Sequence, residues 1–185
     1  MNRDSVVLLD RDGVINFDRD DYIKTPDEWI PIPGSLEAIA KLYQANFRVF
    51  IITNQSGVGR GLYTLETMHL IHEKMLTQVN SLGGSIEHIY FCPHHPDENC
   101  DCRKPKTGML RQLVADHNVS LENAPFVGDT LKDVQAALSM KADPKVVLSG
   151  KGRREIDIIK KQMPEVDIFK DLASFVSHYL SNIDQ

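Results

Sequence analysis

Acidic and hydroxyl side chains follow three short apolar runs of the sequence. Asp10 and Asp12 come directly after the first run, Thr53 follows the second and Asp129 follows the third. If the runs are parallel strands, their carboxyl ends meet at one edge of a sheet, where ligands bind. Three carboxylates at one edge repel one another unless a cation lies between them, and hard oxygen ligands of this kind suit Mg²⁺.

These groups are the parts needed for phosphoryl transfer. A carboxylate is a competent nucleophile towards phosphorus once Mg²⁺ neutralises the phosphate. A second carboxylate two residues later can protonate the leaving alkoxide and then take a proton from water. A hydroxyl and backbone amides would hold the phosphoryl oxygens, and a lysine such as Lys104 would offset charge in the transition state. The sequence therefore indicates a Mg²⁺-dependent phosphatase that forms an aspartyl-phosphate.

Each motif has a simpler interpretation when it stands alone. Asp-x-Asp-Gly is often a turn or part of a Ca²⁺ loop. The sequence at 53–57 is compatible with a helix cap and a glycine turn, and Gly-Asp-x-x-x-Asp at 128–133 with a turn and a capped helix. Their occurrence together, each at the end of a predicted strand, is much more specific for catalysis.

A second cluster of chemically active residues lies between the second and third motifs. Cys92 and His94 form one pair, and Cys100 and Cys102 form another five residues later. Three thiolates and one imidazole make a closed tetrahedral set, which is typical of a structural Zn²⁺ site. The alternative is a group of buried free cysteines. His95 is the rival imidazole, and we prefer His94 because Cys-x-His mirrors Cys-x-Cys.

The zinc-bound loop has a predicted positional role. Its acidic and amide residues at 97–99 cannot pack a core, so bound metal would order it. Arg103 and Lys104 follow the last ligand directly, which would place them at the edge of the sheet. Arg103 there can bind a sugar hydroxyl or a second phosphate. The alternative is that both side chains are simply solvated.

The elements that must position these groups alternate along the chain. Ser35 is a plausible N-cap for the first helix, and Gly83 and Gly84 end the second. Strands and helices that alternate with long connections predict an α/β domain of three layers, Rossmann-like, with a mainly parallel central sheet. We expect strands at 6–9, 47–52, 86–91, 125–127, 145–148 and 166–169, and helices at 35–46, 64–81, 107–118, 131–140 and 172–181.

Length and composition limit the remaining possibilities. The 185 residues fit one domain, 1–185, and leave no stretch long enough for a separate cap domain. A net charge of −5 argues against nucleic acid as a partner. No apolar run is long enough to cross a membrane, and no secretory signal precedes the first strand. We expect a cytoplasmic protein, and a monomer because no heptad pattern is sustained.

These motifs together resemble the haloacid dehalogenase superfamily of phosphatases. Within it, the chain is similar to the small zinc-carrying heptose-1,7-bisphosphate 7-phosphatases and histidinol-phosphate phosphatases. The resemblance covers nearly the whole chain and is carried by LDRDGVIN at 9–16, TNQSG at 53–57, CPHHP at 92–96, CDCRKP at 100–105 and VGD at 127–129. Sequences at 22–34, 56–61 and 106–110 resemble the heptose group more closely, whereas Thr130 and the short zinc loop depart from some of its members.

The resemblance implies a role for each residue that matches these motifs. Asp10 is the nucleophile and Asp12 the acid and base. Mg²⁺ would be held by Asp10, the carbonyl of Asp12 and Asp129, with Asp133 behind them. The phosphoryl group would be bound by Thr53, Asn54 and Lys104, and the rest of the substrate by Asp18, Tyr22, Gln55, Ser56, Arg103 and Thr130.

The predicted activity is therefore removal of the 7-phosphate from D-glycero-D-manno-heptose 1,7-bisphosphate in the synthesis of nucleotide-activated heptose for lipopolysaccharide. The partner is a small sugar phosphate. Three alternatives stay open at this point. They are a histidinol-phosphate phosphatase, a phosphatase of nucleic-acid 3′ ends, and a zinc-stabilised binding module without catalysis.

Overall fold

Six apolar runs form one parallel sheet in the computed structural model, which describes residues 5–183. Each strand pairs in parallel with its neighbours, in the order β3-β2-β1-β4-β5-β6. Side chains of the central strands are apolar on both faces because both faces are covered. The strands are β1 (Val6–Leu9), β2 (Arg48–Asn54), β3 (His88–Cys92), β4 (Pro125–Gly128), β5 (Asp143–Val147) and β6 (Asp167–Phe169).

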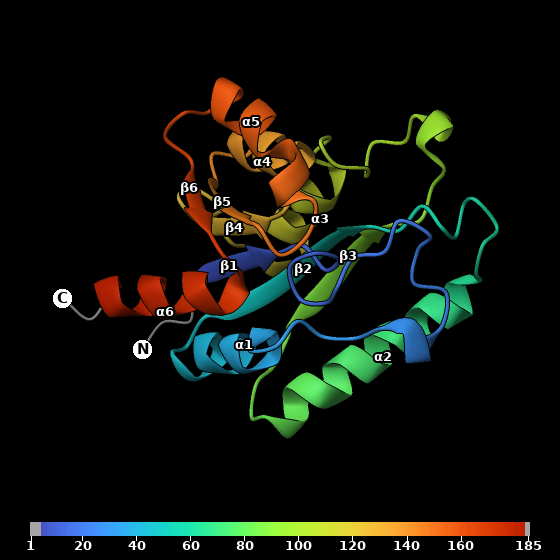
Figure 1. The fold of residues 1–185 in the computed structure, drawn as a ribbon, viewed down its shortest axis with the longest axis horizontal. Coiled ribbons are helices and arrows are strands. Elements are labelled where there is room, and N and C mark those ends of the chain that lie inside the picture. Colours follow the sequence, from blue (N-terminus) through green and yellow to red (C-terminus); the bar gives the residue numbers. More distant parts are fainter. Residues whose placement is uncertain (1–4, 184–185) are drawn as a thin grey trace.

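Helices cover the two faces of the sheet and complete three layers (Figure 1). The helices α1 (Ser35–Gln44), α2 (Leu65–Ser81) and α6 (Leu172–Ile183) lie on one side, and α3 (Gly108–His117), α4 (Leu131–Ser139) and α5 (Gly152–Gln162) lie on the other. Two short 3₁₀ turns, η1 (Pro26–Glu28) and η2 (Pro96–Glu98), interrupt the loops. Each side has its own apolar core against the sheet. The predicted three-layer α/β architecture is confirmed.

Two local expectations were wrong. Helix α5 was not predicted, because only Gly152 and Ile159 of its residues are buried and the apolar stripe is too thin to recognise. Ser35 is not the N-cap of α1. Gly34 holds that position with a φ of +84°, and the Ser35 hydroxyl instead donates a 2.6 Å hydrogen bond to the carbonyl of Ile15. That bond ties α1 to the loop after β1.

The topology brings the three motif-bearing strands together. The sheet grows in one direction from β1 to β2 and β3, and in the other from β1 to β4, β5 and β6. The carboxyl ends of β1, β2 and β4 are therefore adjacent at the point where ligands bind in such sheets. Within residues 5–183, the connection from β1 to β2 contains η1 and α1, and that from β3 to β4 contains η2 and α3, without an inserted cap domain. None of the helices in this part of the chain is both long and apolar enough to cross a membrane.

We predict that the face of the sheet under α1 is a main source of stability. Leu42 is fully buried there, whereas Leu70 on α2 is 47% exposed. Leu42→Ala should lower the free energy of unfolding by about 2–5 kcal/mol, and Leu70→Ala by less than about 0.5 kcal/mol, because only the first leaves a cavity. Urea titration of both variants measures the difference. Equal losses would contradict the assigned core.

Candidate active site

A polar pocket of about 330 Å³ opens at the carboxyl ends of β1, β2 and β4. Every residue predicted to act on phosphate or substrate lines it, and Asp133 alone of the predicted magnesium-site residues does not. The pocket also contains residues to which the sequence had assigned no role, among them Tyr63, Lys132, Lys151 and Glu155. Lys151 lies in the segment 149–152, which follows β5, so the same inspection of strand ends would have found it.

Asp10 stands at the end of the central strand with its carboxylate towards this pocket. Its backbone amide donates to the carbonyl of Val127 (2.9 Å), and its Oδ1 accepts from the amide of Arg11 (2.7 Å). The ammonium of Lys104 lies 2.9 Å from Oδ2. Burial raises the pKa of Asp10 to about 6, against the opposing charge of Lys104 and with the repulsion of Asp133.

Asp129 is held between two glycines. A methyl group on Gly13 would lie 2.2 Å from its Oδ2, and one on Gly150 would lie 2.1 Å from the same atom. Oδ2 accepts a 2.6 Å hydrogen bond from the amide of Lys151. Burial, together with the charges of Asp133 and Asp10, raises the pKa of Asp129 well above its ordinary value. The carboxylate is therefore placed firmly but forms no ion pair with a side chain among residues 5–183.

Asp133 links the start of α4 to Lys104. Its Oδ2 accepts from the amide of Asp129 (3.3 Å), the amide of Thr130 (3.0 Å) and the hydroxyl of Thr130 (2.7 Å). Its Oδ1 lies 2.6 Å from the Lys104 ammonium. Both oxygens are thus engaged by the protein, which fits the supporting place predicted for this residue. The Thr130 hydroxyl caps the helix, and its predicted contact with substrate stays a prediction.

These carboxylates fit a hard divalent cation. Ligand oxygens of Asp10, Asp129 and Asp133 all lie within 4.8 Å of one another, and all three residues are buried. Burial and the neighbouring carboxylates disfavour the ionised forms of Asp10 and Asp129 and raise their pKa values, so a cation there would remove an electrostatic cost. Because Asp133 does not line the pocket, whereas Asp10 and Asp129 do, the latter two would be the ligands of Mg²⁺.

Asp12 is surrounded by donors in the wall of the pocket. Asn16 Nδ2 donates to Oδ1 (2.9 Å), Gln55 Nε2 donates to Oδ2 (2.8 Å), and the guanidinium of Arg11 donates to both oxygens. Burial works against ionisation here, but the Arg11 charge and these donors lower the pKa of Asp12 overall. The amide of Gln55 is engaged with Arg11, Tyr63, Asp12 and Thr53, so it supports the site, and its predicted contact with substrate stays a prediction.

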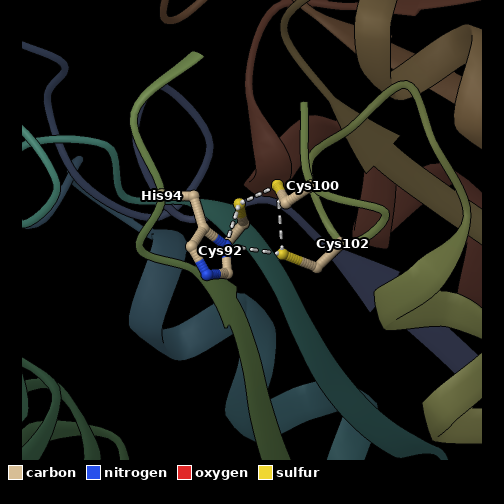
Figure 2. Close-up of side chains that lie close together, drawn as sticks. All are labelled: Cys92, His94, Cys100 and Cys102. Carbon is tan, nitrogen blue, oxygen red and sulfur yellow. Dashed lines mark hydrogen bonds between the residues drawn. The ribbon is translucent and has the colours of Figure 1, made fainter. Parts of the chain in front are cut away.

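The cysteine-rich loop brings four possible ligands together. Figure 2 shows the side chains of Cys92, His94, Cys100 and Cys102 converging on one point. Hydrogen-bond-range separations among the sulfur atoms and the Nδ1 atom of His94 run from 3.1 to 3.7 Å. Ligands about 2.0–2.3 Å from a tetrahedral Zn²⁺ are about 3.5–3.8 Å apart, so the cluster fits that ion closely. Sulfur atoms 3.4 and 3.5 Å apart are not in a disulfide.

The choice of His94 over His95 agrees with this geometry. The ring of His95 accepts from the amide of Asp97 (3.2 Å) and its own amide donates to Glu98 (2.6 Å), which caps η2.

The cysteine-rich loop is also hydrogen-bonded to the segment that follows β2. The amides of Gln55 and Gly59 each donate 2.8 Å hydrogen bonds to carbonyls of the loop, those of Cys92 and Pro93.

Lys104 enters the pocket from this loop. The amide of Lys104 donates to Asn54 Oδ1 (3.0 Å), and Asn54 Nδ2 donates to the Lys104 carbonyl (3.2 Å). Asn54 thus holds the backbone of Lys104, while its predicted contact with phosphate stays untested. The Lys104 ammonium also donates to the carbonyl of Ile52 (2.6 Å). The side chain is 98% buried, which by itself lowers the pKa, but the charges of Asp10 and Asp133 raise the pKa of Lys104 overall.

The outer wall of the pocket carries the remaining predicted contacts. Asp18 is paired with Lys151 (2.7 Å), and Tyr22 has a left-handed backbone with a φ of +68°. Nη1 of Arg103 is buried and has no hydrogen-bond partner among the described residues. Ser56 is buried at the pocket wall. A buried guanidinium donor without a partner beside an open pocket is suited to an anionic ligand.

Known proteins share this arrangement. Residues 5–146 match the family model of the polynucleotide kinase 3 phosphatase. A D-glycero-β-D-manno-heptose-1,7-bisphosphate 7-phosphatase of Pseudomonas putida is 50% identical over 170 residues, which are 91% of this chain and 95% of that protein. The chain belongs to the heptose-bisphosphate phosphatase family. The resemblance to the haloacid dehalogenase superfamily is thereby confirmed.

Solved structures of this heptose-bisphosphate phosphatase family agree with the fold. The D,D-heptose 1,7-bisphosphate phosphatase of B. bronchiseptica, in complex with magnesium and phosphate, superposes with a TM-score of 0.92 at 43% identity, over 96% of this chain and 99% of that one. The enzyme of Burkholderia thailandensis has a TM-score of 0.74 at 36% identity, with the same coverage. Members of this family are phosphoric monoester hydrolases.

We predict that Mg²⁺ binds more weakly at low pH. The pKa of Asp10 is raised to about 6, so in metal-free protein the folded state loses stability as pH rises from about 4 through 6. Below pH 6, Mg²⁺ must displace a proton from Asp10 in order to bind. The apparent dissociation constant for Mg²⁺ should be about tenfold higher at pH 5 than at pH 7.

Thermal-shift titration with Mg²⁺ at the two pH values measures this effect. Asp129→Asn should weaken binding at both values, whereas Asp27→Asn, at an exposed carboxylate outside the pocket, should change neither. The same affinity at pH 5 and pH 7 in the unmodified protein would contradict the assignment of Asp10 as a ligand.

Proposed function

We propose that the chain removes the 7-phosphate of D-glycero-β-D-manno-heptose 1,7-bisphosphate and releases heptose 1-phosphate. The observation that carries this proposal is the assembly of Asp10, Asp12, Thr53, Lys104 and Asp129 in one pocket. That pocket lies in a chain half identical to an enzyme with this name. The anomer is taken from the names of the relatives.

The first chemical step transfers the phosphoryl group to Asp10. The carboxylate of Asp10 attacks phosphorus, the bond from phosphorus to the sugar oxygen breaks, and Asp12 gives a proton to that oxygen. The ammonium of Lys104 already touches Asp10, so it can follow the charge onto the phosphoryl oxygens. Mg²⁺ bound by Asp10 and Asp129 would neutralise the phosphate so that an anionic nucleophile can approach.

The second step hydrolyses the aspartyl-phosphate. Water attacks phosphorus, its proton passes to the ionised Asp12, and the bond to Asp10 breaks to release inorganic phosphate. The donors around Asp12 favour the ionised carboxylate, which is the form that accepts this proton. Because the same donors weaken the binding of a proton to Asp12, a protonated Asp12 readily gives its proton to the leaving oxygen in the first step.

The second phosphate of the substrate requires further cations. Arg103, Lys132 and Lys151 line the outer part of the pocket, apart from Lys104 at its base. Arg103 is the cation best suited to bind the second phosphate, because its buried Nη1 has no hydrogen-bond partner in the described part of the chain. We therefore assign the distal phosphate to Arg103 and the sugar hydroxyls to Asp18 and Tyr22, which line the same pocket.

Other activities are less well supported. Histidinol phosphate is not favoured, since the curated relatives at 43–50% identity are named as heptose phosphatases. The name of the matching family model points to nucleic-acid 3′ ends, but the net charge of −5 disfavours a polyanionic partner. A binding module without catalysis leaves the full set of catalytic side chains without a purpose.

We predict a strong preference for one substrate. Initial rates at fixed Mg²⁺ should favour the β anomer of heptose 1,7-bisphosphate over histidinol phosphate and a 3′-phosphorylated oligonucleotide by at least about a hundredfold, or about 2.7 kcal/mol of transition-state discrimination. Asp10→Asn should remove turnover of every substrate, while the exposed control Asp27→Asn should retain it. A flat profile would discard the heptose assignment, and turnover by Asp10→Asn would discard the covalent mechanism.

We also propose that Cys92, His94, Cys100 and Cys102 bind one structural Zn²⁺. Closed four-ligand sets of this kind stabilise loops and leave no open position for a reactant. The bound ion would hold the loop that carries Arg103 and Lys104, so its effect on catalysis would be indirect.

The two adjacent histidines offer a matched test of the zinc site. Purified protein should contain one zinc per chain, and His94→Ala should lose it and lower kcat/KM at least about tenfold, because Lys104 loses its support. His95→Ala should keep the metal and stay within about twofold of normal activity. Elemental analysis and kinetics on both variants decide, and zinc retained by His94→Ala would disprove the ligand set.

The cellular setting follows from the proposed activity. A heptose bisphosphate is a phosphorylated intermediate, so we place the enzyme in the cytoplasm, in the synthesis of nucleotide-activated heptose for lipopolysaccharide. We propose that it acts as a monomer on a small sugar phosphate, without nucleic acid or membrane partners.

A further inference from the structure

Arg11 is a charged residue in an unusual position. It lies between Asp10 and Asp12, yet its side chain turns into the protein and is 99% buried. It does not line the pocket. A buried guanidinium is costly unless it is paired and its donors are used. The question is therefore which groups receive these donors.

The main recipient is the carboxylate of Asp12. Arg11 Nε donates to Oδ1 (3.0 Å), and Nη2 donates to both Oδ1 and Oδ2 (2.9 Å each). Asn16 and Gln55 add one hydrogen bond to each oxygen. A carboxylate that receives five hydrogen bonds from three side chains has one orientation. Proton transfer to a leaving oxygen requires such placement, since errors of about 1 Å cost large factors in rate.

The remaining donors fix Arg11 itself. Nη1 lies 3.1 Å from Nε2 of His72, a residue of α2 that is 96% buried. Because arginine only donates, this His72 nitrogen must be the acceptor of a neutral ring. Burial and the Arg11 charge lower the pKa of His72 to about 3, which agrees with a neutral ring.

Gln55 is oriented by the same network. Its Oε1 accepts from Arg11 Nη2 (2.9 Å) and from the hydroxyl of Tyr63 (2.9 Å). Its Nε2 is thereby turned towards Asp12 and the Thr53 hydroxyl. One connected set of hydrogen bonds thus runs from α2 and from Tyr63 to the acid and base of the pocket.

We propose that Arg11 is a positioning residue, held by His72 and acting with Gln55, that aims the Asp12 carboxylate at the oxygen of the leaving group. This inference rests on the proposed phosphatase activity. It assigns Arg11 no contact with substrate. Its effect should therefore fall on the two steps in which Asp12 donates or accepts a proton, and much less on binding.

The leaving group provides the test. A sugar alkoxide needs a proton to depart, whereas p-nitrophenolate departs without one. The variant Arg11→Lys keeps the positive charge but loses the forked hydrogen bonds of the guanidinium. In this variant, single-turnover cleavage of heptose 1,7-bisphosphate should slow at least about a hundredfold. Release of p-nitrophenolate from p-nitrophenyl phosphate in a single turnover should slow less than about fivefold. KM for the heptose substrate should change less than about threefold. The p-nitrophenyl ester should then show a one-equivalent burst before slow turnover, because Asp12 is also needed for hydrolysis of the aspartyl-phosphate.

A matched control and a second variant complete the experiment. Arg48 makes a similar fork to Glu87 away from the pocket, so Arg48→Lys should leave both rates within about twofold. If Arg11→Lys fails to fold, Tyr63→Phe, which only loses the hydroxyl bond to Gln55, should show the same selective slowing at about tenfold.

The outcomes separate this inference from the proposed function. Equal slowing of both substrates, or slowing of neither, in the folded variants would overturn the positioning role of Arg11. If the unmodified enzyme does not cleave the heptose substrate, the proposed substrate is overturned. If Arg11→Lys then shows the selective loss with another sugar phosphate that the unmodified enzyme cleaves, the role of Arg11 stays supported.

Discussion

Carboxylates of Asp10, Asp129 and Asp133 are buried within 4.8 Å of one another, and the repulsion among them governs how the site is built. Each is accommodated differently. Asp133 is paired with Lys104 and accepts from the amides of Asp129 and Thr130 just before α4. Asp10 shares the same ammonium, and Asp129 accepts from the amide of Lys151. A divalent cation at this place would offset the repulsion, which fits the Mg²⁺ expected at the site.

Lys104 offsets part of that repulsion, and its placement explains the cysteine-rich loop. A lysine ammonium in the interior needs a firmly held backbone, and the short loop after β3 has few apolar side chains with which to form a core. The loop instead gathers three sulfur atoms and an imidazole, is hydrogen-bonded to the end of β2, and is fixed at Lys104 by both ends of the Asn54 amide. A metal ion bound by these four side chains would thus support the placement of the Lys104 charge in the pocket.

Most of this could be predicted from the sequence, for a physical reason. In a parallel sheet the carboxyl ends of adjacent strands share one edge, so residues that follow the strands must converge, and the ligand pairs of the loop are recognisable by spacing. The parts that were missed depend on tertiary packing. Helix α5 has too few buried apolar residues to show its period, and Ser35 bonds to a distant carbonyl that no local pattern indicates.

The supporting roles of side chains were the hardest to predict. No sequence pattern indicated the contacts that Gln55 makes with Tyr63 and Arg11, which come from different parts of the chain, or the contact of Arg11 with His72 sixty-one residues away. Side-chain type and order show that a residue is at the site. Whether it faces the ligand or the protein depends on rotamers and neighbours that only three-dimensional coordinates supply.

The glycine pair around Asp129 has a consequence for where the catalytic unit ends. Every signature motif lies within residues 5–146, the stretch that matches the family model. Gly150 and the amide of Lys151, which enclose the Asp129 carboxylate, lie just outside it. A fragment cut at the last motif would therefore retain all the recognisable residues and lose one side of the ion site. The smallest functional unit is defined by contacts at the end of β5, and its boundary is invisible to motif comparison.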